Sequence, residues 1–245
     1  MSLLADAQRI AEEFADKYKN QALGIIFTGA LARNYFDKFA DIDIVIIGKK
    51  SLPMVKSVPR NGTYKGFVID YWTTTLSQLM KQNWSMPMRW AFSEAVVYHD
   101  TKGTMKKLIK EKARFLKSER KSLMIEGIIQ SEWFCSTLPE VWAARDDIVS
   151  AHGMFDKGVQ HFFEALFSYN NRLVPYEKWR LNYARALPWL PKQFENKLKE
   201  IYLVRRLDKQ ELDRRKRTFM YLWKQLEPRI VKETKMTLKE MDALV

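Results

Sequence analysis

The 245-residue sequence predicts an α+β fold. A small mixed β-sheet domain with flanking helices is expected over residues 1–104, followed by an all-helical bundle domain over 105–245. Two observations support this prediction. Short β-branched segments next to glycine, proline and asparagine occur only in the first part, which is typical of strands. In the second part the strand signals vanish, and apolar residues recur every three or four positions, which is typical of helices.

The first domain is expected to combine helices and strands. Apolar residues from Leu3 to Tyr18 recur at helical spacing, and Gly24 is expected to break this helix. Strands are predicted at residues 25–28, 42–47, 66–72 and 95–98. Between them we expect a helical turn within 31–36, a loop with a short strand at 49–61, and a helix over 76–84.

The second domain is expected to consist of helices alone. The predicted helical stretches are 105–118, 119–150, 154–171, 191–206 and 208–227. Pro175, Pro188 and Pro191 separate the later stretches, because proline removes a backbone donor and clashes inside a helix.

Composition places the chain among globular proteins. Apolar residues make up 47% and charged residues 29%, which excludes a mainly disordered or collagen-like chain. No apolar run approaches the ~18 residues of a membrane helix, and the N-terminus lacks the apolar centre of a signal peptide. Cys135 is the single cysteine, which suits a reducing compartment. We therefore expect a cytoplasmic protein without a membrane partner.

The charge is strongly positive and uneven. The 42 basic and 29 acidic residues give a net charge of +13. Residues 1–104 hold 13 basic and 10 acidic residues, whereas residues 105–245 hold 29 and 19. Such a surface favours nucleotides or nucleic acid by long-range attraction. The basic runs 106–121 and 205–217 are interpreted either as solvated helix faces or as contacts to a phosphate backbone.

Three aspartates form the main candidate site. Asp41 and Asp43 are two residues apart in a predicted strand, so their side chains share one face, and Ile42 and Ile44 share the other. Asp70 lies in a later strand and reaches the same place if the two strands pair. Clustered carboxylates repel one another unless a cation lies between them, and Mg²⁺ prefers such ligands. Three carboxylates can hold two metals that promote phosphoryl chemistry.

A possible phosphate site lies just upstream. Gly29 follows a predicted strand and precedes a predicted helical turn, where backbone amides can bind phosphate oxygens. Glycine also permits a close approach of the phosphate. Arg33 is one turn further on and offers a charge-assisted contact.

These residues resemble the signature of the polymerase-β-type nucleotidyltransferase superfamily. That signature is Gly-Ser, about ten residues, Asp-x-Asp, and a third acid on a later strand. Here Gly29-Ala30 is followed by ten residues, then by Asp41-Ile42-Asp43 and later by Asp70. Ala30 stands where the family has a serine whose hydroxyl contacts a phosphate, and Thr28 offers a hydroxyl nearby.

The resemblance implies transfer of a nucleoside monophosphate from a nucleoside triphosphate, with ATP expected, and release of pyrophosphate. Two Mg²⁺ ions are implied. Asp41 and Asp43 would bind the metals, and Asp70 would hold the catalytic metal and help to activate the acceptor hydroxyl. The turn at Gly29-Ala30 would hold the distal phosphates.

A weaker resemblance extends into the second domain. Val97-Tyr98-His99-Asp100, and later the segment 162–172, resemble the two-part antibiotic adenylyltransferases that act on kanamycin, streptomycin or lincosamides. This implies a small antibiotic-like hydroxyl acceptor held between the domains. A protein or the end of a tRNA is the other acceptor class. Glu94, Glu126 and Glu132 are candidates, by residue type alone, for a general base.

Two other functions remain open. The first is a catalytically idle nucleotide- or RNA-binding protein that retains the fold, motivated by Ala30 and the basic second domain. The second is a helical ribonuclease of a toxin–antitoxin pair, for which Arg145 and His152 form only a poor motif. The histidines His99, His152 and His161 have no zinc-ligand spacing with the cysteine.

Overall fold

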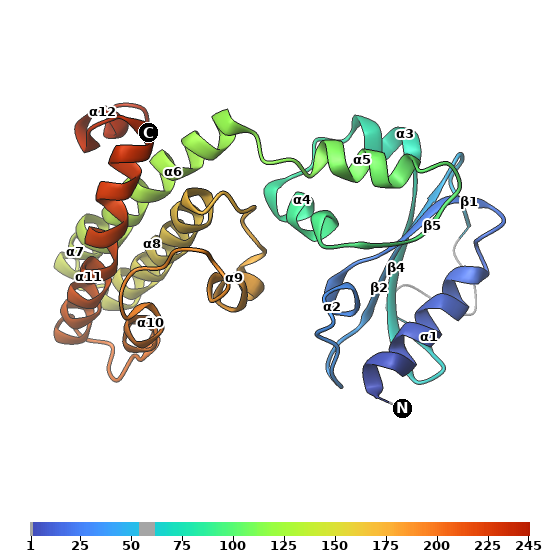
Figure 1. Ribbon diagram of the computed structural model, residues 1–245. Helices are drawn as coiled ribbons and strands as arrows, with labels where there is room; N and C mark the ends of the chain where they lie inside the picture. The colour runs from blue at the N-terminus through green and yellow to red at the C-terminus, as the bar shows by residue number, and fades with distance from the viewer. Residues whose placement is uncertain (1, 54–61) are drawn as a thin grey trace. The chain divides into compact units, whose positions relative to one another are not determined.

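The computed structural model describes residues 2–53 and 62–245, and the chain divides into two compact units (Figure 1). Unit 1 is Met1–Arg114 and unit 2 is Phe115–Val245. The predicted domain boundary lies ten residues earlier and assigns helix α5 (Thr104–Lys112) to the second domain. In the structure α5 belongs to unit 1, because Met105 and Leu108 are buried in the core beside the sheet.

Unit 1 is built on a five-stranded mixed sheet with the order β3-β4-β2-β1-β5. Strands β2 and β4 are parallel, and the other neighbours are antiparallel. This confirms the predicted α+β fold with a mixed sheet. The strands are β1 (Ala22–Phe27), β2 (Ile42–Gly48), β3 (Gly62–Tyr64), β4 (Phe67–Thr75) and β5 (Val96–Asp100).

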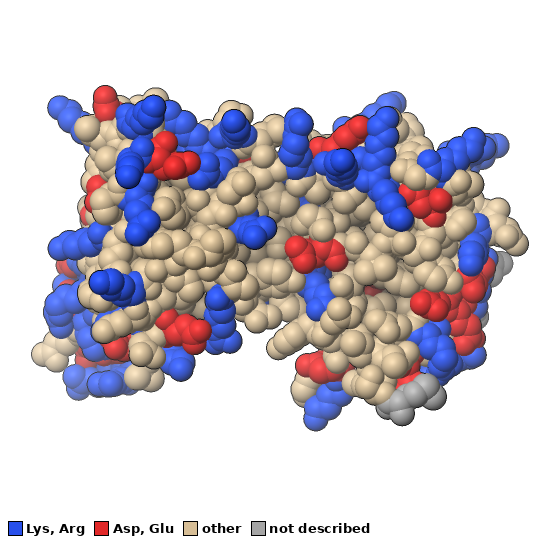
Figure 2. All heavy atoms as spheres, in the orientation of Figure 1, with Lys and Arg blue, Asp and Glu red and all other residues tan. Residues whose placement is uncertain are grey.

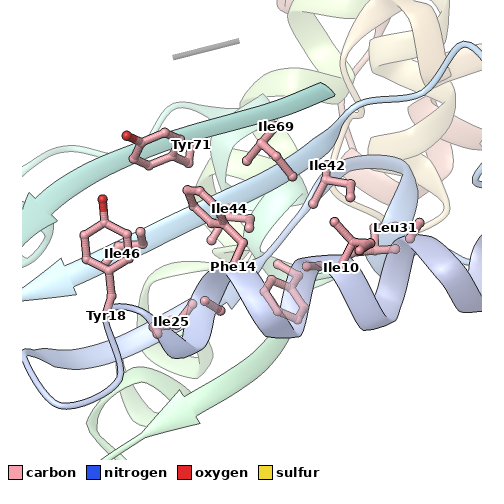
Figure 3. Packing of buried hydrophobic residues seen from close by; sticks show 14 of the residues in the cluster. Ile10, Phe14, Tyr18, Ile25, Leu31, Ile42, Ile44, Ile46, Ile69 and Tyr71 are labelled. Atoms are coloured by element: carbon pink, nitrogen blue, oxygen red, sulfur yellow. The ribbon is translucent and has the colours of Figure 1, made fainter. Parts of the chain in front are cut away.

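Helix α1 (Leu3–Asp16) covers one face of the sheet (Figure 3). Alternate residues of β2, including Ile42 and Ile44, point to this face and are buried with α1. Phe14 of α1 contacts Tyr71 of β4, with ring centroids 4.9 Å apart. Ile42 and Ile44 of β2 are therefore buried against α1, and the residues that alternate with them face the opposite side of the sheet.

Helices α3 (Leu76–Lys81), α4 (Met86–Ser93) and α5 cover the opposite face. Val45 and Ile47 of β2 point to this side and are buried. Because side chains alternate along a strand, Asp43 shares this face with Val45 and Ile47. The sheet is thus covered on both sides, and Asp43 lies toward the side of α3, α4 and α5.

Unit 2 is helical, as expected. It contains α6 (Lys117–Glu132), a π-helical turn (Trp133–Thr137), α7 (Leu138–Ala144), α8 (Ile148–Tyr169), α9 (Glu177–Ala184), α10 (Phe194–Tyr202), α11 (Lys209–Thr234) and α12 (Leu238–Asp242). Glycines allow α8 to approach its neighbours closely: a Cβ on Gly127 would lie 2.6 Å from the backbone nitrogen of Ala165. Cys135 is buried here, and burial raises the pKa of its thiol.

Several predicted element boundaries were wrong. The stretch 119–150 is interrupted by the π-helical turn and by a turn at Asp146, whose φ is +61°. The helix predicted to end at 227 continues through Pro228 to Thr234, because the apolar face of α11 stays buried up to Ile230 and Thr234. Helices α4 and α9 were not predicted, since each is only eight residues long.

Two further expectations concern the first unit. Gly24 does not end the first helix, which stops at Asp16. It lies instead in β1, where the side chain of Met105 occupies the space that a Cβ would need. The short strand expected within 49–61 falls mainly on residues 54–61, which lie outside the described residues. Among the helices of the described residues, none is both long enough and apolar enough to cross a membrane.

Candidate metal centre

The three aspartates converge at the sheet. Asp41 lies immediately before β2, Asp43 is in β2, and Asp70 is in β4. Because β2 and β4 are parallel, with Asp43 paired to Asp70, these two side chains lie side by side on one face. Each of the three residues offers a carboxylate oxygen, and these oxygens lie within 4.8 Å of one another. The structure thus brings together all three predicted ligands.

This donor set suits a hard divalent cation. The three side chains are partly exposed, and all their donor atoms are carboxylate oxygens. Mg²⁺ binds proteins through a few carboxylates and completes its shell with water and phosphate oxygens. A cation also relieves the repulsion between carboxylates held this close together. The chemistry of the donors therefore fits the magnesium that the resemblance implies.

The turn after β1 lies against one of these carboxylates. The backbone N–H of Thr28 donates to the carbonyl of Asp43 over 3.0 Å, which extends the pairing of β1 and β2 by one residue. Gly29 then takes a φ of +62°, a left-handed conformation that favours glycine. A Cβ on Gly29 would overlap the carboxylate of Asp43. A side chain at this position would therefore strain the backbone and would require the Asp43 carboxylate to move.

Arg33, predicted to contact a phosphate, makes two contacts near this turn. Its Nη1 donates to the carbonyl oxygen of Gly29 over 2.6 Å. Its guanidinium carbon lies 4.0 Å from the ring centroid of Trp90, a buried residue of α4. Arg33 therefore ties the Gly29 turn to α4. Sequence reasoning missed Trp90 because the helix that carries it was not predicted.

The other residues of the predicted nucleotide site flank the same turn. Thr28 is the N-cap of α2 (Gly29–Ala32), and its side chain makes no capping hydrogen bond with that helix. Ala30 lies within α2, and its carbonyl accepts a hydrogen bond from the N–H of Tyr35 over 3.0 Å. The hydroxyl nearest to this turn in the sequence is therefore that of Thr28. It precedes Gly29, whereas the family serine follows the glycine.

The remaining candidates lie outside the carboxylate group. Glu94 is exposed at the end of α4, and Glu126 and Glu132 are on α6 in unit 2. Among the residues that the structure describes, only Asp41, Asp43 and Asp70 form a group of three or more side chains able to hold a metal ion.

No protein-family model and no curated protein matches this sequence. The chain is similar to a solved structure, a nucleotidyltransferase-like protein from Exiguobacterium sibiricum, at 12% sequence identity and a TM-score of 0.50. The match covers 92% of this chain and 77% of the other. At this identity the likeness is one of fold. The chain therefore has a nucleotidyltransferase-like fold, with three clustered aspartates that are able to bind a metal.

Proposed function

We propose that this protein is a magnesium-dependent nucleotidyltransferase that transfers a nucleoside monophosphate, with ATP as the expected donor, to an acceptor hydroxyl. The observation that carries the proposal is the convergence of Asp41, Asp43 and Asp70 beside a left-handed glycine turn. Carboxylates from adjacent parallel strands give a rigid set of metal ligands, because the backbone pairing fixes their separation.

The aspartates would hold two Mg²⁺ ions, with Asp70 as a ligand of the catalytic ion. When bound, these ions would neutralise phosphate charge and lower the pKa of the acceptor hydroxyl. Thr28, Gly29 and Ala30 would hold the distal phosphates. Arg33 would support this turn through its hydrogen bond to the Gly29 carbonyl. In this arrangement, catalysis relies on positioning and on electrostatics.

The acceptor is proposed to be a small hydroxyl-bearing molecule of antibiotic-like size, with a protein, an RNA or the end of a tRNA as the alternatives. The second candidate function is a nucleotide- or RNA-binding protein that retains the fold without catalysis. Ala30 favours this alternative, because a methyl group replaces the hydroxyl that the family uses at a phosphate. The retention of all three aspartates favours the enzyme.

Calorimetric titration with ATP, with and without Mg²⁺, tests the proposal on the full-length chain. The variant Asp41→Asn/Asp43→Asn removes two ligand charges with little change in shape. Asp6→Asn is the matched control, because Asp6 lies on α1 and outside the carboxylate group. We expect Mg²⁺-dependent ATP binding in the wild type and in the control, and at least a tenfold loss in the double variant.

The two functions predict different results in this titration. Mg²⁺-dependent binding that the double variant loses would support the metal and phosphate site, and labelled ATP would then identify the acceptor. Absence of binding at millimolar ATP would contradict the transferase proposal. A salt-dependent titration with RNA would then test the binding function.

A further inference from the structure

The loop between α2 and β2 presents an aromatic ring to solvent two residues before Asp41. Phe39 is 85% exposed, more than any other large apolar side chain of the described residues. It precedes Asp41 by two residues, so their Cα atoms are at most ~7 Å apart. Burial of a phenylalanine side chain stabilises a folded protein, and Phe39 contributes little of this stabilisation because its ring is in solvent.

Local contacts hold Phe39 in this outward position. Phe36 anchors the loop, because its ring packs at 6.1 Å from that of Phe67 at the start of β4. The side chain of Asp37 then accepts a hydrogen bond from the backbone N–H of Phe39 over 2.8 Å, and the carbonyl of Asp37 accepts one from Ala40 over 3.2 Å. The chain therefore turns between an anchored ring and an exposed one.

A cation accompanies the exposed ring. The Nζ atom of Lys38 lies 4.9 Å from the ring centroid of Phe39. The loop thus presents a flat apolar surface and a positive charge together, shortly before Asp41, the first of the candidate metal ligands. A nucleotide has the complementary features: a flat aromatic base and a chain of negative phosphates. A lipid surface would instead fit a wider group of apolar side chains.

We infer that Phe39 stacks on the base of the nucleotide bound at the aspartates, with Lys38 beside the phosphates or the ring. This inference rests on the proposed function and adds to it a residue that recognises the base. Stacking is tolerant of base identity, because every base has an aromatic face. Phe39 is therefore expected to strengthen nucleotide binding in general and to discriminate weakly between ATP and GTP.

The test compares Mg·ATP with magnesium tripolyphosphate, which has the phosphates and no base. Calorimetry is carried out on the full-length wild type, Phe39→Ala and Phe39→Trp. Tyr221→Ala is the matched control, because Tyr221 is 40% exposed on α11 and has the Nζ of Lys197 at 5.6 Å from its ring. It is an exposed aromatic residue with a lysine neighbour, and it belongs to unit 2.

We expect Phe39→Ala to weaken Mg·ATP binding by about tenfold to a hundredfold, the range typical of base–aromatic stacking. Binding of tripolyphosphate should change less than twofold. Phe39→Trp should retain ATP affinity, and Tyr221→Ala should match the wild type with both ligands.

Other outcomes separate this inference from the proposed function. If the wild type binds both ligands and Phe39→Ala binds ATP equally well, the stacking role is overturned and the metal site stands. An equal loss for both ligands would also overturn it, because Phe39 would then hold the loop and not the base. A Phe39-dependent dimer in sedimentation would assign the ring to contact with a second copy. If the wild type binds neither ligand, the proposed function fails as well.

Discussion

Gly29 and Asp43 depend on each other for their positions. Gly29 has no Cβ, and the Asp43 carboxylate lies in the space that a Cβ would occupy. Glycine also adopts the φ of +62° at little energetic cost. Arg33 adds a hydrogen bond to the Gly29 carbonyl and contacts Trp90. A single backbone turn thus controls where one of the three carboxylates points.

Gly29→Ala is expected to displace the Asp43 carboxylate and to weaken Mg²⁺ and Mg·ATP binding by at least tenfold. The left-handed conformation alone costs roughly 1–2 kcal/mol for a residue with a Cβ, which should also lower the melting temperature. Calorimetry and thermal unfolding measure the two effects separately.

Gly66→Ala supplies the control for backbone strain. Gly66 also has a positive φ, of +87°, but a Cβ there would meet no atom within 4 Å. This variant should lose stability and retain Mg²⁺ affinity. Equal losses of affinity in both variants would contradict the role assigned to the contact between Gly29 and Asp43.

At the scale of elements, the start of α11 is held by a compact group of polar contacts. Asp208 caps the helix by accepting from the N–H of Glu211 over 2.9 Å. Arg214 donates hydrogen bonds to Glu211 over 3.0 Å and 2.7 Å, and the backbone N–H of Arg205 donates over 3.2 Å. These donors, with Arg214 the largest cause, lower the pKa of the Glu211 carboxyl to about 2.

Glu211→Gln is therefore expected to reduce the pH dependence of stability. The pKa of Glu211 in the folded chain lies below the ordinary value of 4.5, so its contribution is complete above pH 4.5 and is lost as the pH falls toward 2. The variant should be less stable at pH 7 by about 1–2 kcal/mol, allowing for solvent screening near the surface.

Urea unfolding at pH 7, 4 and 3 measures this contribution. The difference in unfolding free energy between wild type and Glu211→Gln should shrink as the pH falls. Glu227→Gln, later in the same helix, is the control and should show the pH dependence of the wild type. A constant difference between Glu211→Gln and wild type at all three pH values would contradict the assignment.

At the scale of the whole molecule, the positive charge is distributed unevenly along the chain, and one short segment is especially rich in basic residues. Residues 105–114 alone hold five basic residues and one acidic residue. Most of this segment is α5, and Lys and Arg side chains gather over α5 on the face seen in Figure 2. Lys106, Lys107 and Lys110 of α5 are exposed, because Met105 and Leu108 on the opposite side of the helix are buried in the core.

Binding to a short RNA duplex is expected to depend steeply on salt. Three phosphate contacts would lower the affinity by about tenfold to a hundredfold between 50 mM and 200 mM salt. Lys106→Gln/Lys107→Gln/Lys110→Gln should reduce both the affinity at low salt and the salt slope, and should leave Mg·ATP binding unchanged. A filter-binding titration measures the slope. An unchanged slope would show that α5 is only a solvated helix face.

The sequence by itself determined the mixed sheet, the change to helices after it, and the three aspartates as a set. Strand periodicity fixes that Asp43 faces away from Ile42 and Ile44, and this property is local. Only the tertiary structure decided that β4 pairs with β2 in parallel and places Asp70 beside Asp43. It also decided the contact between Arg33 and Trp90 and the continuation of α11 through Pro228. These depend on contacts between residues distant in the chain, for which a local pattern carries no signal.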